Sequence, residues 1–394
     1  MPGLNLKDRT LGLYIHIPFC LSKCSYCDFF SLPVSKKVPD SYIEALCNEI
    51  SAAFENQENV TVNSLYIGGG TPSLLSENQI KKLFDHLRHT VSLEENCEVT
   101  VEINPDDVTK SLLECLQEAG VNRLSCGIQS LNDSSLSFCG RRADSSVNKK
   151  ALSLIKDFWT GRLSLDLICG LPEENKESFI QGLEFIISLR PEHISMYSLT
   201  IEEETVLGRQ LSSGFLSYDF DFADELWLCG RDCLEKAGYH HYEVSNFCLE
   251  GNECLHNLKY WSRMDYLGFG AGATGTLYFP GGRAERRTNL NDTDRYIKYW
   301  TSFSSENLPY FIEDINEESG EFEFFMMSLR KIQGFSENEY KKHFLKALPA
   351  KVIEEFQKWR QKGLAEICHE NNDVFFTLGK NGIIYLNSFL KELL

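Results

Sequence analysis

Short apolar segments rich in β-branched residues recur along the first 200 residues of the chain, and each has the length of one buried strand. They lie at Leu13–Phe19, Ser64–Ile67, Glu98–Ile103, Asn122–Gln129, Leu163–Cys169 and His193–Leu199. Longer stretches with helical spacing lie between most of them, at Asp40–Phe54, Glu77–His89, Thr109–Glu118 and Glu174–Leu189. This alternation predicts an α/β fold with a parallel sheet and right-handed crossovers.

Six strand–helix units are too few for a closed eightfold barrel, so a partial (β/α)6 TIM-like barrel competes with a doubly wound open sheet. Polar residues stand at or near the ends of the predicted strands: the cysteine loop at 20–27, Gly68–Gly70, Glu102, Asn104, Gln129, Ser130, Asp166 and Tyr197. A barrel gathers the ends of all its strands around one mouth, whereas an open sheet does not. The polar residues therefore favour the partial barrel.

The alternation stops after residue 200, which indicates a different organisation in the second half. A connecting region is expected at 236–309, with HNLKYW at 256–261 and the Gly-rich GFGAGATG at 268–275. From about residue 310, helical patterns and a strand hairpin predict a small winged-helix-like α+β domain. Its expected elements are Gly320–Lys331, Ser336–Phe344, Val352–Lys362, Ala365–Cys368, Val374–Thr377 and Lys380–Leu393. The predicted division is thus 1–235 for the barrel, 236–309 for the connection and 310–394 for the small domain.

Charge and composition narrow the class of partner. The formal net charge of −18 repels phosphate backbones, so we expect no nucleic-acid substrate. Lys7, Asp8 and Arg9 interrupt the start of the chain, which argues against a signal peptide, and no apolar run has the length of a membrane span. We therefore expect a cytoplasmic protein, in which the 14 cysteines are mostly small buried hydrophobes rather than disulfides.

Three cysteines differ from the others because they fall within eight residues. Cys20, Cys24 and Cys27 form C-x3-C-x2-C just after the first predicted strand. Thiolates are soft ligands that suit an iron–sulfur cluster or zinc, and a four-iron cluster held by three cysteines keeps one iron open for another ligand. Aromatic residues around the loop, among them Tyr26 and Phe29, would keep a cluster dry. Zinc with a fourth ligand from elsewhere is the alternative.

The string YIHIPFCLSKCSYCDFFS at 14–31 resembles the signature of radical S-adenosylmethionine enzymes, in the branch of oxygen-independent coproporphyrinogen III oxidases. Further matches follow in order over nearly the whole chain, at YIGGGTP (66–72), VEINP (101–105), RLSCGIQS (123–130), GRR (140–142) and SLDLICGLP (164–172). The resemblance implies a partial (β/α)6 barrel with an appended wing-bearing helical domain, in agreement with the pattern above.

The resemblance also implies a role for single residues. The three cysteines would hold three irons of a 4Fe–4S cluster, and S-adenosylmethionine would chelate the fourth. The implied cofactor-binding residues are Tyr14, Tyr26, Gly69, Gly70, Thr71, Glu102, Gln129, Arg141 and Asp166. The glycines permit close approach of the backbone, and Arg141 offers a fixed cation for a carboxylate. No residue is assigned firmly to catalysis.

Two features separate this chain from the decarboxylating oxidases. Phe29 stands where those enzymes carry a further cysteine, and Tyr14 comes without the longer segment that precedes it in them. The string His256-Asn257-Leu258-Lys259-Tyr260-Trp261 is similar to the H-N-x-x-Y-W mark of HemW-type haem chaperones. That resemblance implies haem as cargo, with His256 as a candidate iron ligand and Tyr260 and Trp261 against the porphyrin. The alternative is that all three are core residues.

Three functions follow from these observations. The first is a haem chaperone on a radical S-adenosylmethionine scaffold, which delivers haem to an apoprotein. The second is an enzyme, coproporphyrinogen III oxidase or another radical reaction on a tetrapyrrole. The third is a non-catalytic zinc or cluster protein for interaction. Implied partners are haem or another tetrapyrrole, a haem-accepting apoprotein, a flavodoxin- or ferredoxin-type reductant, and a partner at the membrane periphery.

Overall fold

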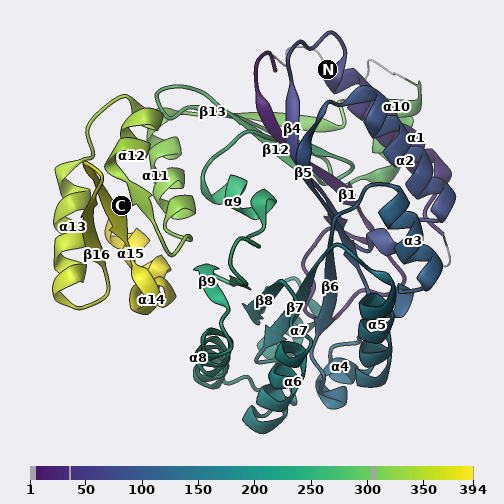
Figure 1. The fold of residues 1–394 in the computed structure, drawn as a ribbon, viewed down its shortest axis with the longest axis horizontal. Coiled ribbons are helices and arrows are strands. Elements are labelled where there is room, and N and C mark those ends of the chain that lie inside the picture. Colours follow the sequence, from purple (N-terminus) through teal and green to yellow (C-terminus); the bar gives the residue numbers. More distant parts are fainter. Residues whose placement is uncertain (1–5, 35–36, 303–307, 394) are drawn as a thin grey trace.

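Six parallel strands form the centre of the large sheet. They are β1 (Thr10–Ile17), β4 (Thr61–Gly69), β5 (Leu93–Ile103), β6 (Arg123–Gln129), β7 (Arg162–Cys169) and β8 (His193–Ser198), in this spatial order. The computed structural model describes residues 6–34, 37–302 and 308–393 (Figure 1). All six predicted strands are present, and the α/β fold class with its partial barrel is confirmed.

The sheet continues beyond both outer strands of this parallel core. Beyond β1 it adds β11 (Tyr266–Phe269), which is parallel, and then the antiparallel β12 (Thr274–Tyr278), β13 (Ala284–Asn289) and β14 (Tyr310–Ile315). Beyond β8 it adds the antiparallel β10 (Asn246–Cys248) and β9 (His240–Glu243). Among the described residues β14 and β9 are the two edges, so the curved sheet stays open.

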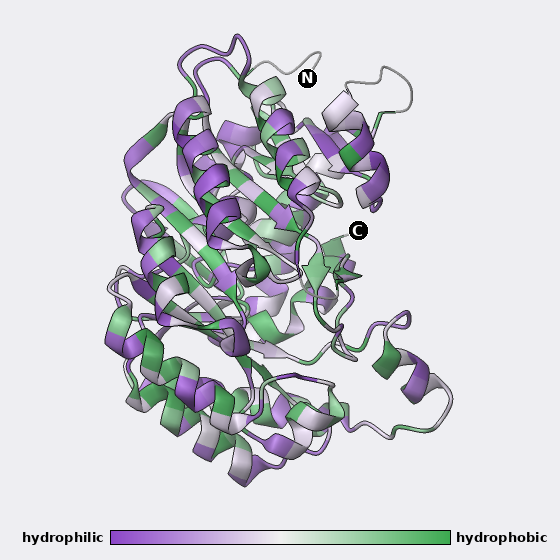
Figure 2. Ribbon diagram, turned by 90° about the vertical axis from the view of Figure 1, so that its right-hand side faces the viewer, coloured by the Kyte–Doolittle hydropathy of each residue, from purple (hydrophilic) through white to green (hydrophobic). Residues whose placement is uncertain are grey.

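Helices cover the outer face of the barrel and alternate with its strands. They are α1 (Asp40–Phe54), α2 (Glu77–Thr90), α3 (Lys110–Glu118), α4 (Asp133–Phe138), α5 (Ser145–Phe158) and α6 (Lys176–Ser188). Figure 2 shows hydrophobic and hydrophilic residues alternating along these helices, as expected where one stripe packs on a sheet. The predicted helices agree closely with the observed ones. Helices α4 and α5 are the additions, and the N-cap of α5, Asp144, accepts from the Val147 amide.

Short elements and the second half of the chain complete the large domain. They are β2 (Phe19–Cys20), β3 (Leu32–Pro33), η1 (Pro72–Leu74), η2 (Pro105–Asp107), α7 (Val206–Ser212), α8 (Phe220–Lys236), α9 (Leu255–Trp261) and α10 (Thr293–Ser302). Helix α10 packs against α1, and α8 packs against α6 and β8. In the part of the chain that the structure describes, no helix combines the length and the apolar character that a bilayer crossing requires.

The small domain has its own hydrophobic core. Its elements are α11 (Glu317–Ser328), β15 (Phe335–Ser336), α12 (Glu337–Phe344), α13 (Ala350–Gln361), β16 (Glu366–Glu370), β17 (Asp373–Thr377), α14 (Gly379–Gly382), η3 (Ile383–Tyr385) and α15 (Leu386–Leu393). Buried aromatic side chains, with Phe324 and Phe356 among them, fill its centre. The order helix, strand, two helices and hairpin gives the predicted winged-helix-like domain, with the final helix broken into three pieces.

The boundary near residue 310 differs from the sequence-based division. Strand β14 pairs with β13 over its full length and therefore belongs to the large sheet. The small domain begins with α11. The connecting region at 236–309 is likewise part of the large domain, because it supplies β9 to β13. Antiparallel strands at a sheet edge lack the strand–helix alternation that reveals the parallel core in the sequence.

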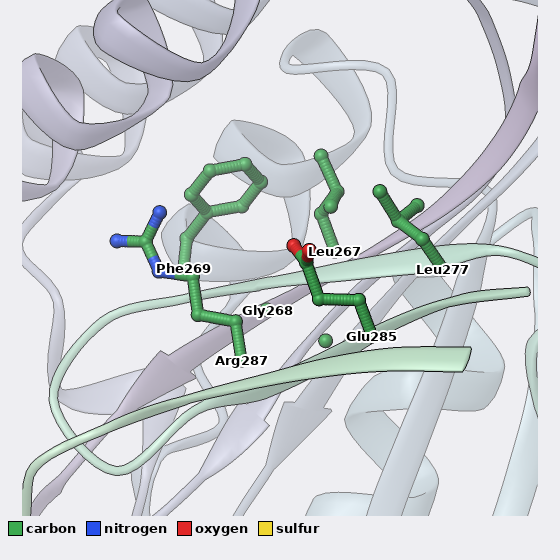
Figure 3. Close-up of a pocket in the computed structure, with 7 residues that line it drawn as sticks. Leu267, Gly268, Phe269, Leu277, Glu285 and Arg287 are labelled. Carbon is green, nitrogen blue, oxygen red and sulfur yellow. The ribbon is translucent and has the colours of Figure 1, made fainter. Parts of the chain in front are cut away.

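The Gly-rich stretch GFGAGATG forms the close crossing of β11 and β12. A Cβ added to Gly268 would lie 2.3 Å from the Thr274 carbonyl oxygen, so no side chain fits there. Figure 3 shows the small cavity beside this crossing, with Phe269 and Leu277 on its walls. Its volume is about 20 Å³, enough for about one water, so we assign it no ligand.

One buried carboxylate joins the barrel to the antiparallel strands. Glu49 of α1 is fully buried and accepts hydrogen bonds from the Gly270 amide (2.8 Å), Asn289 Nδ2 (2.9 Å) and the Tyr296 hydroxyl (2.6 Å). The oxygen that accepts from Asn289, Oε1, also lies 3.2 Å from Arg287 Nη2. A buried charge is tolerated at this position because these donors satisfy it.

Substitution of this carboxylate tests that account. Glu49→Ala removes the acceptor of three buried hydrogen bonds and the carboxylate beside Arg287, so we expect the free energy of unfolding to fall by about 3–5 kcal/mol. The measurement is urea unfolding followed by circular dichroism. The control is Glu44→Ala, an exposed position on the same helix, where the expected change is within about 0.5 kcal/mol. Equal losses in both variants would contradict the assigned role.

Candidate functional site

The three clustered cysteines lie at the mouth of the barrel and share one cavity. Cys20 ends β2, and Cys24 and Cys27 lie in the loop between β2 and β3. All three thiols are partly exposed and line a cavity of about 400 Å³. Burial raises the pKa of the Cys27 thiol to about 11. Three soft ligands therefore face one space at the end of the strands.

Backbone hydrogen bonds hold the cysteine loop in place. The Leu32 amide donates to the Pro18 carbonyl (2.8 Å), and the Val34 amide donates to the Cys20 carbonyl (2.9 Å). The Ser25 amide donates to Cys139, in the turn after α4, at 3.0 Å. The loop is thus tied both to its own entry strand and to the far side of the barrel mouth.

Two polar side chains approach the sulfur atoms from the opposite wall. The Thr71 hydroxyl donates to Cys20 Sγ at 3.4 Å, and Arg141 Nη1 donates to Cys24 Sγ at 3.6 Å. Arg141 Nη2 also donates to the Gly127 carbonyl at 2.6 Å, which orients the guanidinium, while its buried Nε has no partner within the described residues. A cation and a hydroxyl therefore contact two of the three sulfur atoms.

The glycine segment at the end of β4 runs directly along the strand that carries Cys20. A Cβ at Gly70 would lie 2.7 Å from the Phe19 carbonyl oxygen, and a Cβ at Gly69 would lie 2.5 Å from His16 Nδ1. Gly69 also has φ of +115°, which other residues rarely adopt. Glycine is required at Gly70 because two backbones approach closely, and at Gly69 because of its φ and the neighbouring His16 ring.

Glu102 and Asp166 place two carboxyl groups on the inner wall of the cavity. Glu102 accepts from the Tyr66 hydroxyl (2.8 Å) and from the Gly69 amide (3.1 Å), and burial raises its pKa to about 7. Asp166 accepts from the Ser125 hydroxyl at 2.8 Å, and burial raises its pKa as well. Carboxyls at this position suit an ammonium group or ribose hydroxyls.

Gln129 ends β6 in a left-handed conformation with φ of +66°. The register between β6 and β7 shifts at the same point, between Gly127 and Gln129. A bulge at a strand end turns the side chain toward the cavity, which Gln129 lines. A strained residue at this place is typical of a binding site.

The lining of this cavity can be compared with the residues named from the sequence. It includes the three cysteines with Tyr26, Gly69, Gly70, Thr71, Glu102, Gln129, Arg141 and Asp166. Tyr14 is the exception: it lines a second cavity, and its hydroxyl is 2.8 Å from His16 Nδ1. Tyr14 lies three residues before the end of β1 at Ile17, below the mouth of the barrel.

The donor set fits the expected groups. Three cysteines converge on the cavity, and its described lining contains no fourth cysteine and no histidine. Arg141 and the two carboxyls stand across from them, where the carboxylate and ammonium of an amino acid would find partners. Within residues 6–34, 37–302 and 308–393, no group of three His, Cys, Asp or Glu side chains is close enough to hold a single metal ion.

Helix α9, which carries H-N-x-x-Y-W, packs against β4 and α11. His256 is buried; its Nδ1 lies 2.9 Å from Ser64 Oγ and its Nε2 lies 2.8 Å from the Tyr260 hydroxyl. Burial lowers its pKa to about 3, so the ring is neutral. The interpretation of His256 as a haem ligand is not supported, because both ring nitrogens already have partners.

The aromatic residues of the same motif have a different environment. Tyr260 and Trp261 are half-buried and line the second cavity together with Tyr14. They thus face a space on the flank of the barrel, whereas His256 faces its interior. The motif combines a structural residue and two cavity-lining residues.

Several residues of the first cavity were not named as site residues from the sequence. Tyr66 orients Glu102, and Arg142 pairs with Asp106 and, at 3.1 Å, with Asp107 at the rim. Both lie inside quoted motifs, YIGGGTP and GRR, so proximity to a motif was the available signal. Ser125 also lies inside a quoted motif, RLSCGIQS, but a serine inside a strand is common and only the register turns it toward Asp166.

The structural role of His256 leads to a test of stability. His256→Ala leaves the hydroxyls of Ser64 and Tyr260 unpaired and opens a cavity in the barrel, so we expect unfolding to become easier by about 2–4 kcal/mol. Thermal and urea unfolding measure this. The exposed Leu255 on the same helix provides the control, since Leu255→Ala should cost less than about 1 kcal/mol. A His256→Ala protein as stable as the parent would contradict the buried role.

Comparison with known proteins agrees with this geometry. A family model described as the Radical SAM superfamily matches residues 14–186. Heme chaperone HemW of Escherichia coli is 35% identical over 336 residues, covering 85% of this chain and 86% of that protein. Heme chaperone HemW of Bacillus subtilis is 34% identical, covering 92% and 94%. Radical S-adenosyl methionine domain-containing protein 1, mitochondrial, of Mus musculus is 36% identical, covering 77% and 69%.

Among solved structures, coproporphyrinogen III oxidase (HemN) from Escherichia coli superimposes with a TM-score of 0.80. It is 21% identical and covers 98% of this chain and 90% of that one, so the likeness shows a shared fold. The identities of 34–35% to the HemW proteins extend over most of both chains. The chain therefore belongs to the HemW family of the radical SAM superfamily.

Proposed function

We propose that this protein is a haem chaperone, which binds a 4Fe–4S cluster, S-adenosylmethionine and haem, and delivers haem to apoproteins. The observation that carries the proposal is the cavity where Cys20, Cys24 and Cys27 face Arg141 and Glu102, in a chain whose relatives are named heme chaperone HemW. The superfamily itself implies the cluster and S-adenosylmethionine. Haem and its delivery are inferred from the names of the relatives.

Each lining group has a proposed task. The three cysteines would hold the cluster, and Arg141, already oriented by the Gly127 carbonyl, would receive the methionyl carboxylate. Gly69 and Gly70 would let the cofactor lie against backbone, and Glu102 would accept hydrogen bonds from it. When bound, the reduced cluster supplies single electrons, while the protein positions the cofactor and limits access of water.

Two observations favour haem delivery over oxidation of coproporphyrinogen III. Phe29 occupies the position where the oxidases carry a further cysteine, and the likeness to coproporphyrinogen III oxidase is one of fold, at 21% identity. The partners that follow from the proposal are a haem-accepting apoprotein and a flavodoxin- or ferredoxin-type reductant. A cytoplasmic location and a recipient at the membrane periphery belong to the same proposal.

Removal of one cysteine tests the cluster. We expect Cys24→Ala to lose most of its iron and acid-labile sulfide after anaerobic reconstitution, because the cube then has only two protein ligands. The control is Cys368→Ala, a partly exposed cysteine of the small domain, which should retain both. Iron, sulfide and zinc analysis with electron paramagnetic resonance measure the result. Stoichiometric zinc without iron in the parent protein would contradict the proposal.

The pKa of Glu102 predicts a pH dependence of cofactor binding. The raised pKa, about 7, means that the carboxyl becomes neutral as pH falls below 7, while its anionic form accepts hydrogen bonds more strongly. S-adenosylmethionine affinity should therefore decrease with falling pH, approaching roughly tenfold per unit below the pKa. The affinity is measured by equilibrium binding to reconstituted protein between pH 6 and pH 8. These two values lie about one unit below and above the pKa of Glu102. Glu102→Gln should show a flatter profile, and parallel profiles would exclude Glu102 as the titrating group.

A turnover assay decides between carriage and reaction. Reconstituted protein is incubated with coproporphyrinogen III, S-adenosylmethionine and a reductant, and in parallel it is loaded with haem and mixed with an apo-cytochrome. We expect haem transfer to the apoprotein and no decarboxylated tetrapyrrole. Vinyl products together with 5′-deoxyadenosine would instead establish the oxidase.

A further inference from the structure

A second cavity, of about 410 Å³, lies between the flank of the barrel and the small domain. Its walls come from β1, β11, β12, β13, the end of α9, the cysteine loop and α11. The lining residues are Tyr14, His16, Phe29, Phe30, Tyr260, Trp261, Tyr266, Gly272, Thr274, Tyr278, Arg286 and Met327. Phe29 also lines the cysteine cavity, so its side chain borders both spaces.

Aromatic rings dominate this lining. The rings of Tyr260 and Tyr266 meet edge to face with centroids 4.6 Å apart, and Trp261 stands 6.4 Å from Tyr260. Phe29 is 64% exposed although it is a large apolar side chain on an ordered loop. A set of aromatic faces with one ring left in solvent is typical of a site for a flat apolar ligand.

Three polar side chains on the walls already have partners. His16 Nε2 lies 3.0 Å from the Phe30 carbonyl oxygen, and its Nδ1 lies 2.8 Å from the Tyr14 hydroxyl. Arg286 of β13 pairs with Glu323 of α11 at 2.9 Å and so joins the small domain to the barrel. The walls therefore offer a peptide few free hydrogen-bonding groups, and the histidine ring has no free nitrogen for a metal.

Met327 brings a thioether to the same space. It lies in α11 next to Met326, which packs on the hydrophobic core of the small domain. Consecutive residues of a helix point in different directions, and Met327 is the one that faces the cavity. A thioether is one of the axial ligands that haem iron takes in proteins.

We propose that haem docks in this second cavity, with Phe29 and Tyr260 against the macrocycle and Met327 on the iron. The inference rests on the proposed haem-carrying function and names the cavity in which haem would bind. The cavity is within the range of about 300–1,000 Å³ for ligand sites, and it is open to solvent on one side, where the propionates can stay hydrated. The bound haem would then lie beside the cysteine loop, with Phe29 between haem and the cysteine cavity.

Paired variants test the site in the full-length reconstituted protein. Ferric haem is titrated and followed by absorption and magnetic circular dichroism. We expect Phe29→Ala to weaken haem binding on the order of tenfold, because an aromatic face is lost. The matched control is Phe215→Ala, a phenylalanine that is 77% exposed and lies between α7 and α8, outside the lining of this cavity. It should bind like the parent.

The ligand is tested by a second pair. Met327→Leu keeps the volume but removes sulfur, so we expect loss of the thioether–iron spectral signature, whereas Met326→Leu should keep it. Unchanged spectra for Met327→Leu would overturn the ligand assignment, and parent-like affinity of Phe29→Ala would overturn the location. A parent protein that binds no haem would overturn the proposed function itself.

Discussion

The arrangement of this protein depends on one close crossing of two backbones. The end of β4 passes so near the strand leading to Cys20 that a Cβ at Gly70 would fall 2.7 Å from the Phe19 carbonyl oxygen. That contact brings the cysteine loop over the mouth of the barrel and places Gly69 where its amide reaches Glu102. Thiols and a carboxyl thus share one cavity because glycine permits the approach.

The interior of the barrel is polar, and α9 completes it. Glu98 is fully buried and receives the His256 amide at 3.1 Å and an ion pair from Arg162 at 3.4 Å. His256 in turn bridges Ser64 and Tyr260. Buried polar groups of this kind are stable only when partners surround them, so the helix is held inside the barrel. This fixes the end of α9, with Tyr260 and Trp261, beside the second cavity.

The two cavities share a wall but differ in chemistry. One combines thiols, carboxyls and Arg141, which suits a charged nucleotide and a cluster. The other combines aromatic faces with a thioether, and the small domain borders it, joined to the barrel by the pair of Arg286 and Glu323. Phe29, which both cavities share, is the physical connection between them. A change in the cysteine loop would therefore reach both spaces.

The sequence by itself determined the parallel core, the winged-helix-like domain and most of the first cavity. Periodicity identifies strands and helices, and strand ends of a barrel converge, so Cys20, Glu102 and Asp166 could be placed at one mouth. Only the tertiary structure decided that β14 belongs to the large sheet, that His256 is an interior residue, and that Met327 meets Phe29 across a second cavity. These outcomes depend on contacts between residues far apart in the chain, for which local pattern carries no signal.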